Sequence, residues 1–300
     1  AAYPELNYIS DVDVVYVVAP VEPGTAPAAP GAGADEEPAP LKLTENECST
    51  IGTELVHALT RAIMGPAPEP ALWEVDANLR PEGKDGPLVR TVESYVQYYK
   101  RWAENWEFQA LLKARPIAGS AQLGARYARA IDPFVWESAA RESFVESVQA
   151  MRARVTDNIP SNQVERQIKL GPGGLRDIEF TVQLLQLVHG RTDAFLRVRS
   201  TLDAIEALRE GGYIARSDAD QLASCYRFLR AVEHRTQLPR MRRNHLIPDK
   251  DCDLRVLGRA MDPARYPDAD AIRSAIDDVR ADVRALHEDV FYRPIIAATA

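Results

Sequence analysis

Apolar and polar positions divide the chain into two short strand-like segments near its N-terminus and a long helical remainder. Residues 5–16 form a β-branched run that predicts a strand, and in a strand Asp11 and Asp13 lie on the same face. Residues 71–79 alternate well enough to predict a second strand, which carries Asp76. We therefore expect two acidic strands before the helices begin to dominate.

Helical spacing begins after Thr44, which forms a capping-box pattern with Glu47. The apolar residues that follow predict a helix of about five turns. They are Ile51, Leu55, Leu59 and Ile63. Helical periodicity returns over 91–114 and 119–156, and a later helix is expected to start at Ser217, capped with Asp220.

The end of the chain repeats apolar residues at 4-3-4-3-4 spacing, which is typical of a coiled-coil seam packed inside an antiparallel bundle. The seam comprises Ile272, Ile276, Val279, Val283, Leu286 and Val290. Over 91–114 a second stripe is aromatic, and packing explains it better than the stacking of bases. The stripe comprises Tyr95, Tyr99, Trp102 and Trp106.

Two segments rich in Pro and Gly separate these elements. Residues 19–42 have few large apolar groups, so we expect a mobile loop. Gly171–Gly174 lacks the Lys-Ser/Thr of a nucleotide-binding P-loop and predicts a turn before a helix. Arg176, Asp177 and Glu179 begin that helix, where they either cap it or belong to an active site.

Composition narrows the class of protein. The 300 residues are 46% hydrophobic, which is enough for a substantial core, and the net charge of −8 argues against a surface that follows duplex nucleic acid. No apolar run reaches membrane-spanning length, and the N-terminus has no signal-peptide pattern, so we expect a soluble, cytoplasmic protein. The cysteines and histidines show no metal-ligand spacing.

The paired carboxylates are the first candidate for chemistry. Asp11 and Asp13 repel each other unless a cation lies between them, and hard divalent cations such as Mg²⁺ prefer oxygen ligands. Asp76 is a candidate for a third carboxylate. The alternative is a strand whose exposed face is merely acidic.

Cationic residues follow the second strand closely. Residues 79–90 contain the Pro and Gly of a turn, and their cations next to an acidic strand suit the phosphates of a nucleotide. A solvated hairpin with scattered charges is the alternative. The candidate phosphate-binding residues are Arg80, Lys84, Arg90, Lys113 and Arg115.

Three blocks in this order, residues 5–13, 75–90 and 169–180, resemble the bifunctional glutamine synthetase adenylyltransferase/adenylyl-removing enzymes. In that family two related halves each contain a nucleotidyltransferase domain and a helical bundle, and 300 residues accommodate one such unit. The resemblance implies an α+β, mostly helical fold: a nucleotidyltransferase (polymerase β-like) domain over 1–180 with a small mixed sheet, and a helical bundle over 181–300.

The Leu-Asn-Tyr that precedes Ser-Asp-Val-Asp resembles the N-terminal, adenylyl-removing half of the family more than the adenylylating half. The family also places a Gly-Ser or Gly-Gly turn before the Asp-x-Asp strand. Residues 1–10 do not supply that turn, so this chain is expected to lack the clamp for its nucleotide.

The resemblance implies phosphorolysis, in which inorganic phosphate attacks an AMP group on a tyrosine of glutamine synthetase and ADP leaves. Asp11, Asp13 and Asp76 would hold two Mg²⁺ ions, and the candidate cations, Arg80 and Arg90 first, would bind phosphates. The implied partners are adenylylated glutamine synthetase, the PII signalling protein and the adenylyltransferase half, with no nucleic acid or membrane. Three alternatives stay open: the adenylylating half, which uses ATP, a non-catalytic PII-sensing module, and a structural scaffold.

Overall fold

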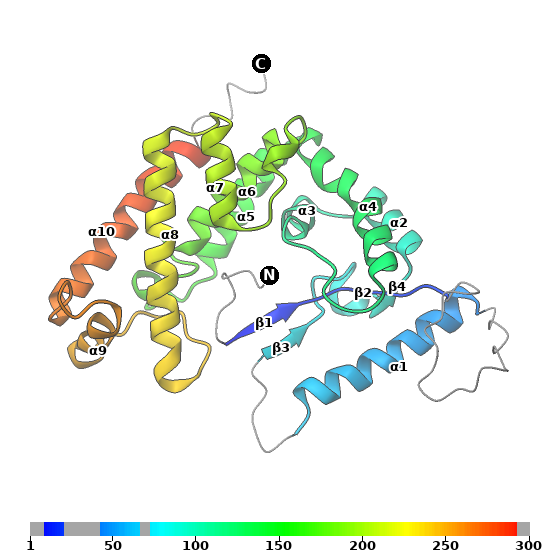
Figure 1. The fold of residues 1–300 in the computed structure, drawn as a ribbon, viewed down its shortest axis with the longest axis horizontal. Coiled ribbons are helices and arrows are strands. Elements are labelled where there is room, and N and C mark those ends of the chain that lie inside the picture. The colour runs from blue at the N-terminus through cyan, green and yellow to red at the C-terminus, as the bar shows by residue number, and fades with distance from the viewer. Residues whose placement is uncertain (1–8, 21–42, 67–72, 293–300) are drawn as a thin grey trace. The chain divides into compact units, whose positions relative to one another are not determined.

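The computed structural model describes residues 9–20, 43–66 and 73–292. Within these residues the protein is mostly helical with small sheets, as predicted (Figure 1). The described strands form two two-stranded sheets, where the sequence predicted one mixed sheet. Nearly all of the predicted loop at 19–42 falls outside the described residues.

The strands are short. Their bounds are β1 (Ser10–Asp13), β2 (Tyr16–Val17), β3 (Trp73–Asp76) and β4 (Val89–Arg90). β1 pairs with β3, and β2 pairs in parallel with β4, with Tyr16 opposite Val89. Both predicted strands are therefore present, but the first is split in two by residues 14–15.

The helices occupy most of the remaining described chain. Their bounds are α1 (Glu45–Met64), α2 (Val92–Arg101), α3 (Asn105–Leu111), α4 (Ala121–Glu137), α5 (Phe144–Asp157), α6 (Leu175–His189), α7 (Thr201–Glu210), α8 (Arg216–Gln237), α9 (Asp251–Met261) and α10 (Ala269–His287).

The chain divides into two compact units. The first, unit 1, contains the described residues within 1–10, 104–114 and 134–300, and unit 2 contains those within 11–103 and 115–133. This division differs from the domain boundary expected at residue 180, which lies inside α6. α6 packs against α3 and α5, which precede that boundary, and against α7, α8 and α10, which follow it, and the whole helix belongs to unit 1.

In unit 2, α1 begins with the capping box that the sequence predicted. The Thr44 hydroxyl accepts a bond from the N–H of Glu47 at 3.3 Å, and the Glu47 carboxylate accepts one from the N–H of Thr44 at 2.8 Å. Gly52 then allows close approach to the sheet, because a Cβ there would lie 3.0 Å from Val89 and 3.4 Å from Val18. The helix packs against β3 and β4.

The aromatic stripe of α2 packs only in part. Tyr95 is fully buried and its hydroxyl donates to the Tyr16 carbonyl at 3.1 Å, which fixes α2 to β2. Tyr99 is also buried, but Trp102 is 71% exposed. The packing role is therefore confirmed for the tyrosines and wrong for Trp102, and Trp106 is exposed as well.

The continuous helix predicted over 91–114 is interrupted. α2 ends at Arg101, and α3 begins after Glu104, whose side chain accepts from the N3 backbone while Glu107 accepts from the N–H of Glu104 at 2.9 Å. A capping box that starts with Glu is less favoured than one that starts with Ser or Thr, so the residues at this break are only a weak signal for a new helix.

The bundle of unit 1 buries the predicted seam of α10. Ile272, Ile276 and Val283 are almost fully buried, and Val279 and Val290 pack against the same core. This part of the prediction is confirmed. Figure 1 shows α10 running beside α8, and both helices contribute to that core.

The predicted start of α8 at Ser217 is wrong. The helix begins at Arg216, its N-cap residue is Ala215, and no side chain caps it. Asp220, the expected capping partner, instead accepts a bond from Arg209 of α7 at 3.2 Å. The tertiary ion pair takes the place of the local cap.

The predicted turn at Gly171–Gly174 is confirmed, and α6 starts directly after it. Gly173 has a φ of +72°, and a Cβ there would lie 2.2 Å from the carbonyl oxygen of Arg280. The buried Arg280 guanidinium donates to the Pro172 carbonyl at 2.9 Å, so α10 holds the turn through both its backbone and a side chain.

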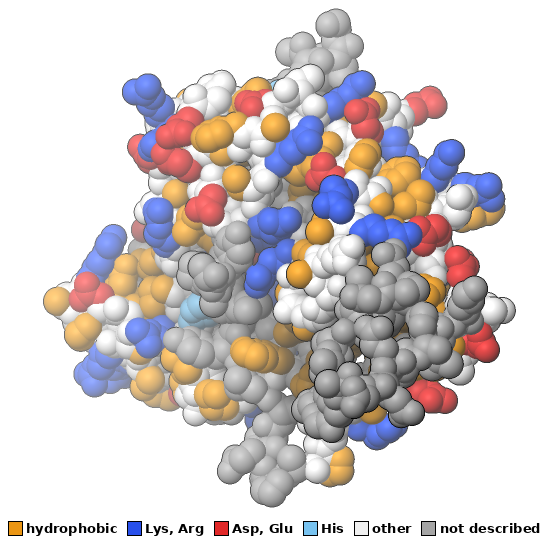
Figure 2. Space-filling model, turned by 45° about the vertical axis from the view of Figure 1, so that its right-hand side comes forward, with side chains coloured by type: hydrophobic (Ala, Val, Ile, Leu, Met, Phe, Trp, Pro, Cys, Tyr) orange, Lys and Arg blue, Asp and Glu red, His pale blue; other side chains and the backbone are white. Residues whose placement is uncertain are grey.

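Within the described ranges, the helices are all too short or too polar to cross a bilayer. On the face drawn in Figure 2, acidic and basic side chains are interspersed with apolar ones.

Candidate functional site

The two acidic strands are neighbours in one sheet of unit 2. β1 ends at Asp13 and pairs with β3, which ends at Asp76. The N–H of Val14 donates to the carbonyl of Asp76, with an N···O distance of 2.7 Å. Asp13 is exposed and Asp11 is half-buried. The structure therefore places the three predicted carboxylates on paired strands.

The three carboxylates are not equally available to a metal ion. One carboxylate oxygen of Asp76 accepts a bond from the N–H of Asn78 at 2.7 Å, which forms a local turn. Among the residues that the structure describes, no three His, Cys, Asp or Glu side chains are grouped closely enough to hold a metal. Mg²⁺ commonly takes one or two protein carboxylates and completes its shell with phosphates and water. Asp11 and Asp13, the two carboxylates of β1, match that number of ligands.

Arg80 holds the turn that follows β3. Its guanidinium donates to the carbonyls of Ala77 at 2.8 Å, Gly86 at 3.2 Å and Lys84 at 3.3 Å. These bonds close the loop on itself, and residue 82 adopts a left-handed conformation, with φ of +63°. The geometry shows Arg80 as a structural residue of the loop that was predicted to bind phosphate.

Arg90 is held at the other end of the same loop. Its guanidinium forms an ion pair with Glu82, donates to the Ser94 hydroxyl at 3.1 Å, and lies 5.9 Å from the centre of the Tyr98 ring. The Arg90 side chain is only 10% exposed. Lys84, by contrast, is exposed at the tip of the loop. Of these three cations, Lys84 is the one whose position is most open to a ligand.

The last two predicted cations fall in different units. Lys113 belongs to unit 1, where its ammonium group donates to the Thr201 hydroxyl at 2.9 Å. Arg115 is exposed and belongs to unit 2, as the three aspartates do. The structure thus does not gather Lys113 and the aspartates into one unit.

Asp177 binds the turn before its own helix and an arginine of α5. One of its carboxylate oxygens accepts from the N–H of Gly173 at 2.6 Å, in the turn before α6. The other lies 2.6 Å from Nη2 of Arg152, and both side chains are almost completely buried. Nη2 of Arg152 also donates to the Leu170 carbonyl at 3.0 Å. This ion pair ties α5 to the turn.

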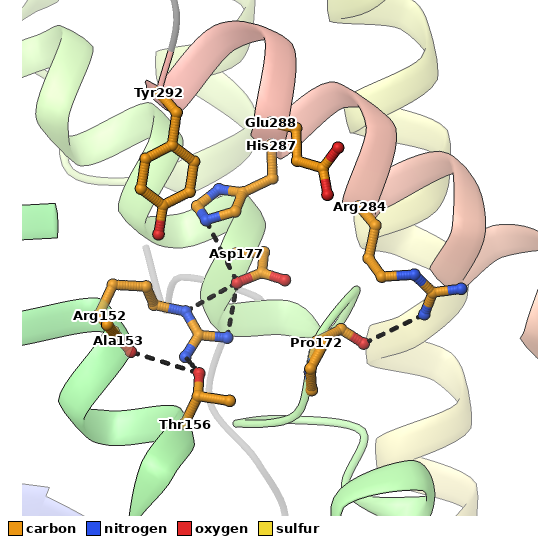
Figure 3. Close-up of a pocket in the computed structure, with 9 residues that line it drawn as sticks. All are labelled: Arg152, Ala153, Thr156, Pro172, Asp177, Arg284, His287, Glu288 and Tyr292. Carbon is orange, nitrogen blue, oxygen red and sulfur yellow. Dashed lines mark hydrogen bonds and ion pairs between the residues drawn. The ribbon is translucent and has the colours of Figure 1, made fainter.

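A small cavity lies beside this ion pair, in unit 1, with a volume of about 160 Å³. Figure 3 shows Asp177 between the Arg152 guanidinium and the His287 ring, with Tyr292 on the same side as His287. The His287 Nδ1 lies 2.8 Å from the Thr181 hydroxyl, and burial is the main cause that lowers the pKa of His287. The lining residues are Arg152, Ala153, Thr156, Pro172, Asp177, Arg284, His287, Glu288 and Tyr292.

Arg176 and Glu179 form an ion pair on another face of α6, at 2.9 Å. Burial raises the pKa of Glu179, but nearby cations, Arg176 first and then Lys113, outweigh burial, and the net shift is downward. The Glu179 carboxylate is therefore ionised in a buried position, in unit 1.

Sequence reasoning missed the partners of these groups. It assigned nothing to Arg152, which sits among the apolar positions of α5, nor to Lys169 and Glu233. A buried polar group is a signal only when its partner is known, and Arg152 and Asp177 lie 25 residues apart. Arg152 directly follows Met151 and leaves the apolar spacing of this helix unbroken, so the sequence did not single it out.

Two protein-family models match the chain. The model described as "Glutamate-ammonia ligase adenylyltransferase" matches residues 3–130, and the one described as "GlnD PII-uridylyltransferase" matches residues 143–291. The first covers most of unit 2, and the second covers α5 to α10 of unit 1.

Curated relatives match almost the entire chain. The "Bifunctional glutamine synthetase adenylyltransferase/adenylyl-removing enzyme" of Streptomyces coelicolor is 53% identical over 296 residues, 99% of this chain. The proteins of the same name from Leifsonia xyli and Bifidobacterium longum are 52% and 45% identical, again over 99% of this chain. The chain spans 28% of the length of each of these relatives.

Proposed function

Because the chain is homologous over 99% of its length to one segment of the bifunctional glutamine synthetase adenylyltransferase/adenylyl-removing enzymes, we propose that it is an adenylyl-removing unit. It would catalyse the attack of inorganic phosphate on the AMP group of adenylyl-tyrosine in glutamine synthetase, releasing ADP and the free tyrosine. The observation that carries this proposal is the placement of Asp11 and Asp13 on β1 directly beside β3, which ends at Asp76.

Asp11 and Asp13 would hold Mg²⁺ together with the phosphate oxygens of the substrate, and Asp76 is the third candidate ligand. When bound, the ion supplies positive charge to the phosphates and to the departing tyrosinate. The spacing of two residues on one strand keeps both β1 carboxylates on one face, where they can act on the same group.

The loop after β3 would bring cations to the phosphates. Arg80 fixes the shape of the loop through three carbonyls, and Arg90 is anchored by Glu82 and Ser94. Lys84, exposed at the tip, would make the direct electrostatic contact with a phosphate. In this arrangement the arginines position the loop, and the lysine meets the ligand.

The choice of the removing half rests on the Leu-Asn-Tyr before Ser-Asp-Val-Asp, which lies outside the described residues. The adenylylating half is the second candidate, and it is favoured by the description of the family model that matches residues 3–130. It would use the same carboxylates with ATP and would release pyrophosphate. A PII-type partner is a further proposal, supported by the family model that matches residues 143–291.

The test is ADP release from adenylylated glutamine synthetase with phosphate and Mg²⁺, for the wild type and for an Asp11→Ala/Asp13→Ala variant. ADP release by the wild type alone supports the removing unit and its acidic strand. ATP-dependent labelling of unmodified glutamine synthetase would instead identify the adenylylating half. If a longer protein with the family's upstream glycine turn also gives neither product, the proposed function is wrong.

A further inference from the structure

A second charged centre lies in unit 1, built by the motif at residues 169–180 and by α8. Its base consists of two buried carboxylates, Glu179 of α6 and Glu233 of α8. Glu233 is fully buried, and its oxygens lie 2.7 Å from Nη1 of Arg230 and 3.0 Å from Nδ1 of His245. Neither carboxylate belongs to the acidic strands of unit 2.

Two basic side chains pair directly with these carboxylates, and two lysines contribute positive charge at the same place. Arg176 pairs with Glu179 at 2.9 Å, and Arg230 pairs with Glu233. We refer to the four as the basic cluster: Lys113, Lys169, Arg176 and Arg230. They come from α6, α8, the segment after α3 and the segment before α6. All four lie close enough to Glu179 for their charges to lower the pKa of its carboxyl group.

The basic cluster is crowded. Burial is the main cause that lowers the pKa of Lys169, and the positive charges of Arg176 and Arg230 lower it further, while Glu233 and Glu179 oppose both effects. Like charges held this closely repel each other in a medium of reduced dielectric. A bound anion would relieve the repulsion among the cations.

Two members of the basic cluster are accessible to solvent. The Arg176 side chain is 37% exposed and Lys113 is an exposed residue, whereas the two carboxylates lie at the buried base. Gln237 follows Glu233 by one turn of α8 and is fully buried. Both of its amide atoms lack a hydrogen-bond partner within the described chain, which points to a polar group that this region does not yet contain.

We propose that the basic cluster binds a phosphate group, either as inorganic phosphate or as the phosphate of a nucleotide. Two arginines offer the planar, multidentate donors that suit phosphate oxygens, and two lysines add charge without a fixed geometry. The four cations and two carboxylates leave a net positive charge of about two, which a doubly charged phosphate neutralises better than a singly charged carboxylate ligand would. This site does not depend on the proposed function, because it uses none of the residues of the acidic strands or of the loop after β3. Lys113 is the one member that the sequence analysis had assigned to the substrate's phosphates, and the structure places it in unit 1 instead.

The test measures the binding of inorganic phosphate and of AMP to the Asp11→Ala/Asp13→Ala variant without Mg²⁺. Calorimetry and NMR are the two readouts. We expect saturable binding at millimolar concentrations that weakens by about tenfold or more in Lys169→Met and in Arg176→Met. Arg259→Met is the control, because Arg259 is an exposed cation on α9 of the same unit. It should leave the affinity unchanged.

Comparing the two ligands shows whether the basic cluster binds inorganic phosphate or the phosphate of a nucleotide. Tighter binding of AMP than of inorganic phosphate identifies a nucleotide phosphate, and equal affinity identifies the phosphate group alone. Thermal unfolding checks that each variant is folded, and because Arg176 is partly exposed, its variant serves if Lys169→Met fails to fold. The proposal is overturned if neither ligand saturates, or if folded variants bind as well as the parent.

Discussion

Arg152 and Asp177 form an ion pair of 2.6 Å whose side chains are 3% and 5% exposed, so two opposite charges from α5 and α6 neutralise each other inside unit 1. A second arginine nitrogen, Nε, donates to the same carboxylate oxygen at 2.7 Å. Because the opposite oxygen accepts from the Gly173 N–H, the pair also fixes the turn before α6.

Asp177→Asn should reduce the free energy of unfolding by about 3–5 kcal/mol, because it leaves the Arg152 charge buried and uncompensated. Urea unfolding followed by circular dichroism measures the change. Asp251→Asn is the matched control, since Asp251 pairs with Arg273 on the surface, where the carboxylate is 67% exposed. A loss as small as that of the control would show that the buried pair does not stabilise the fold.

Comparing Gly173→Ala with Gly212→Ala separates the cost of a strained backbone from the cost of steric overlap between the added Cβ and its neighbours. Both glycines have positive φ, +72° and +75°, but a Cβ at Gly173 would lie 2.2 Å from the Arg280 carbonyl, whereas a Cβ at Gly212 meets nothing within 4 Å. Gly212→Ala should cost about 1–2 kcal/mol for the left-handed conformation alone. Gly173→Ala should cost clearly more, and its melting temperature should fall further. Equal losses would mean that the turn relaxes away from α10.

Acidification should destabilise the protein partly through His287. Burial lowers its pKa below the ordinary 6.5, with Arg152 acting in the same direction and Asp177 against it. Between the lowered pKa and 6.5 the unfolded chain binds a proton that the folded chain does not, so stability falls as pH falls through this window. The contribution of one group cannot exceed about 1.4 kcal/mol per pH unit.

Urea unfolding of the wild type and of His287→Gln, at about pH 7.5 and about pH 5.5, tests this assignment. The variant should lose less stability between the two pH values. Burial also lowers the pKa of His189 and His234, so part of the pH dependence should remain in the variant. An unchanged pH dependence would remove His287 from the explanation.

Asp13→Asn should reduce the proposed release of ADP by about two orders of magnitude or more, because it keeps the side-chain shape and removes a ligand charge. Stability should change little, since Asp13 is exposed. The matched control is Glu54→Gln, an exposed carboxylate on α1 in the same unit. Near-normal turnover of Asp13→Asn would rule out this residue as a metal ligand.

Local signals carried most of what the sequence predicted correctly. Thr44 and Glu47 specify the start of α1 because both halves of the capping box lie within one turn of helix. The seam of α10 could be predicted for the same reason, because a regular apolar spacing is recognised in the sequence even when the partner helices are unknown. The strands carrying Asp11 and Asp76 were also predicted, and the structure adds that they pair.

Interactions between distant residues were beyond the sequence. Asp220 has the spacing of a helix cap, yet Arg209 engages it and α8 starts without a side-chain cap. Arg80 was read as a phosphate ligand because of its charge, whereas three carbonyls of its own loop determine its position. In both cases the composition of the segment was clear, and the partner that decided its role could not be inferred.

The division into units has a consequence for dissecting the protein. Unit 1 takes α3 from the middle of the residues of unit 2, and α3 buries Phe108 and joins α6 through a bond of 2.8 Å between Gln109 and Gln183. The backbone thus passes between the units more than once, and a single cut cannot release either of them intact. A fragment that began at residue 134 would lack α3 and would expose the apolar surface that α3 covers. The helical unit is therefore better studied by complementation with an added α3 peptide than by truncation.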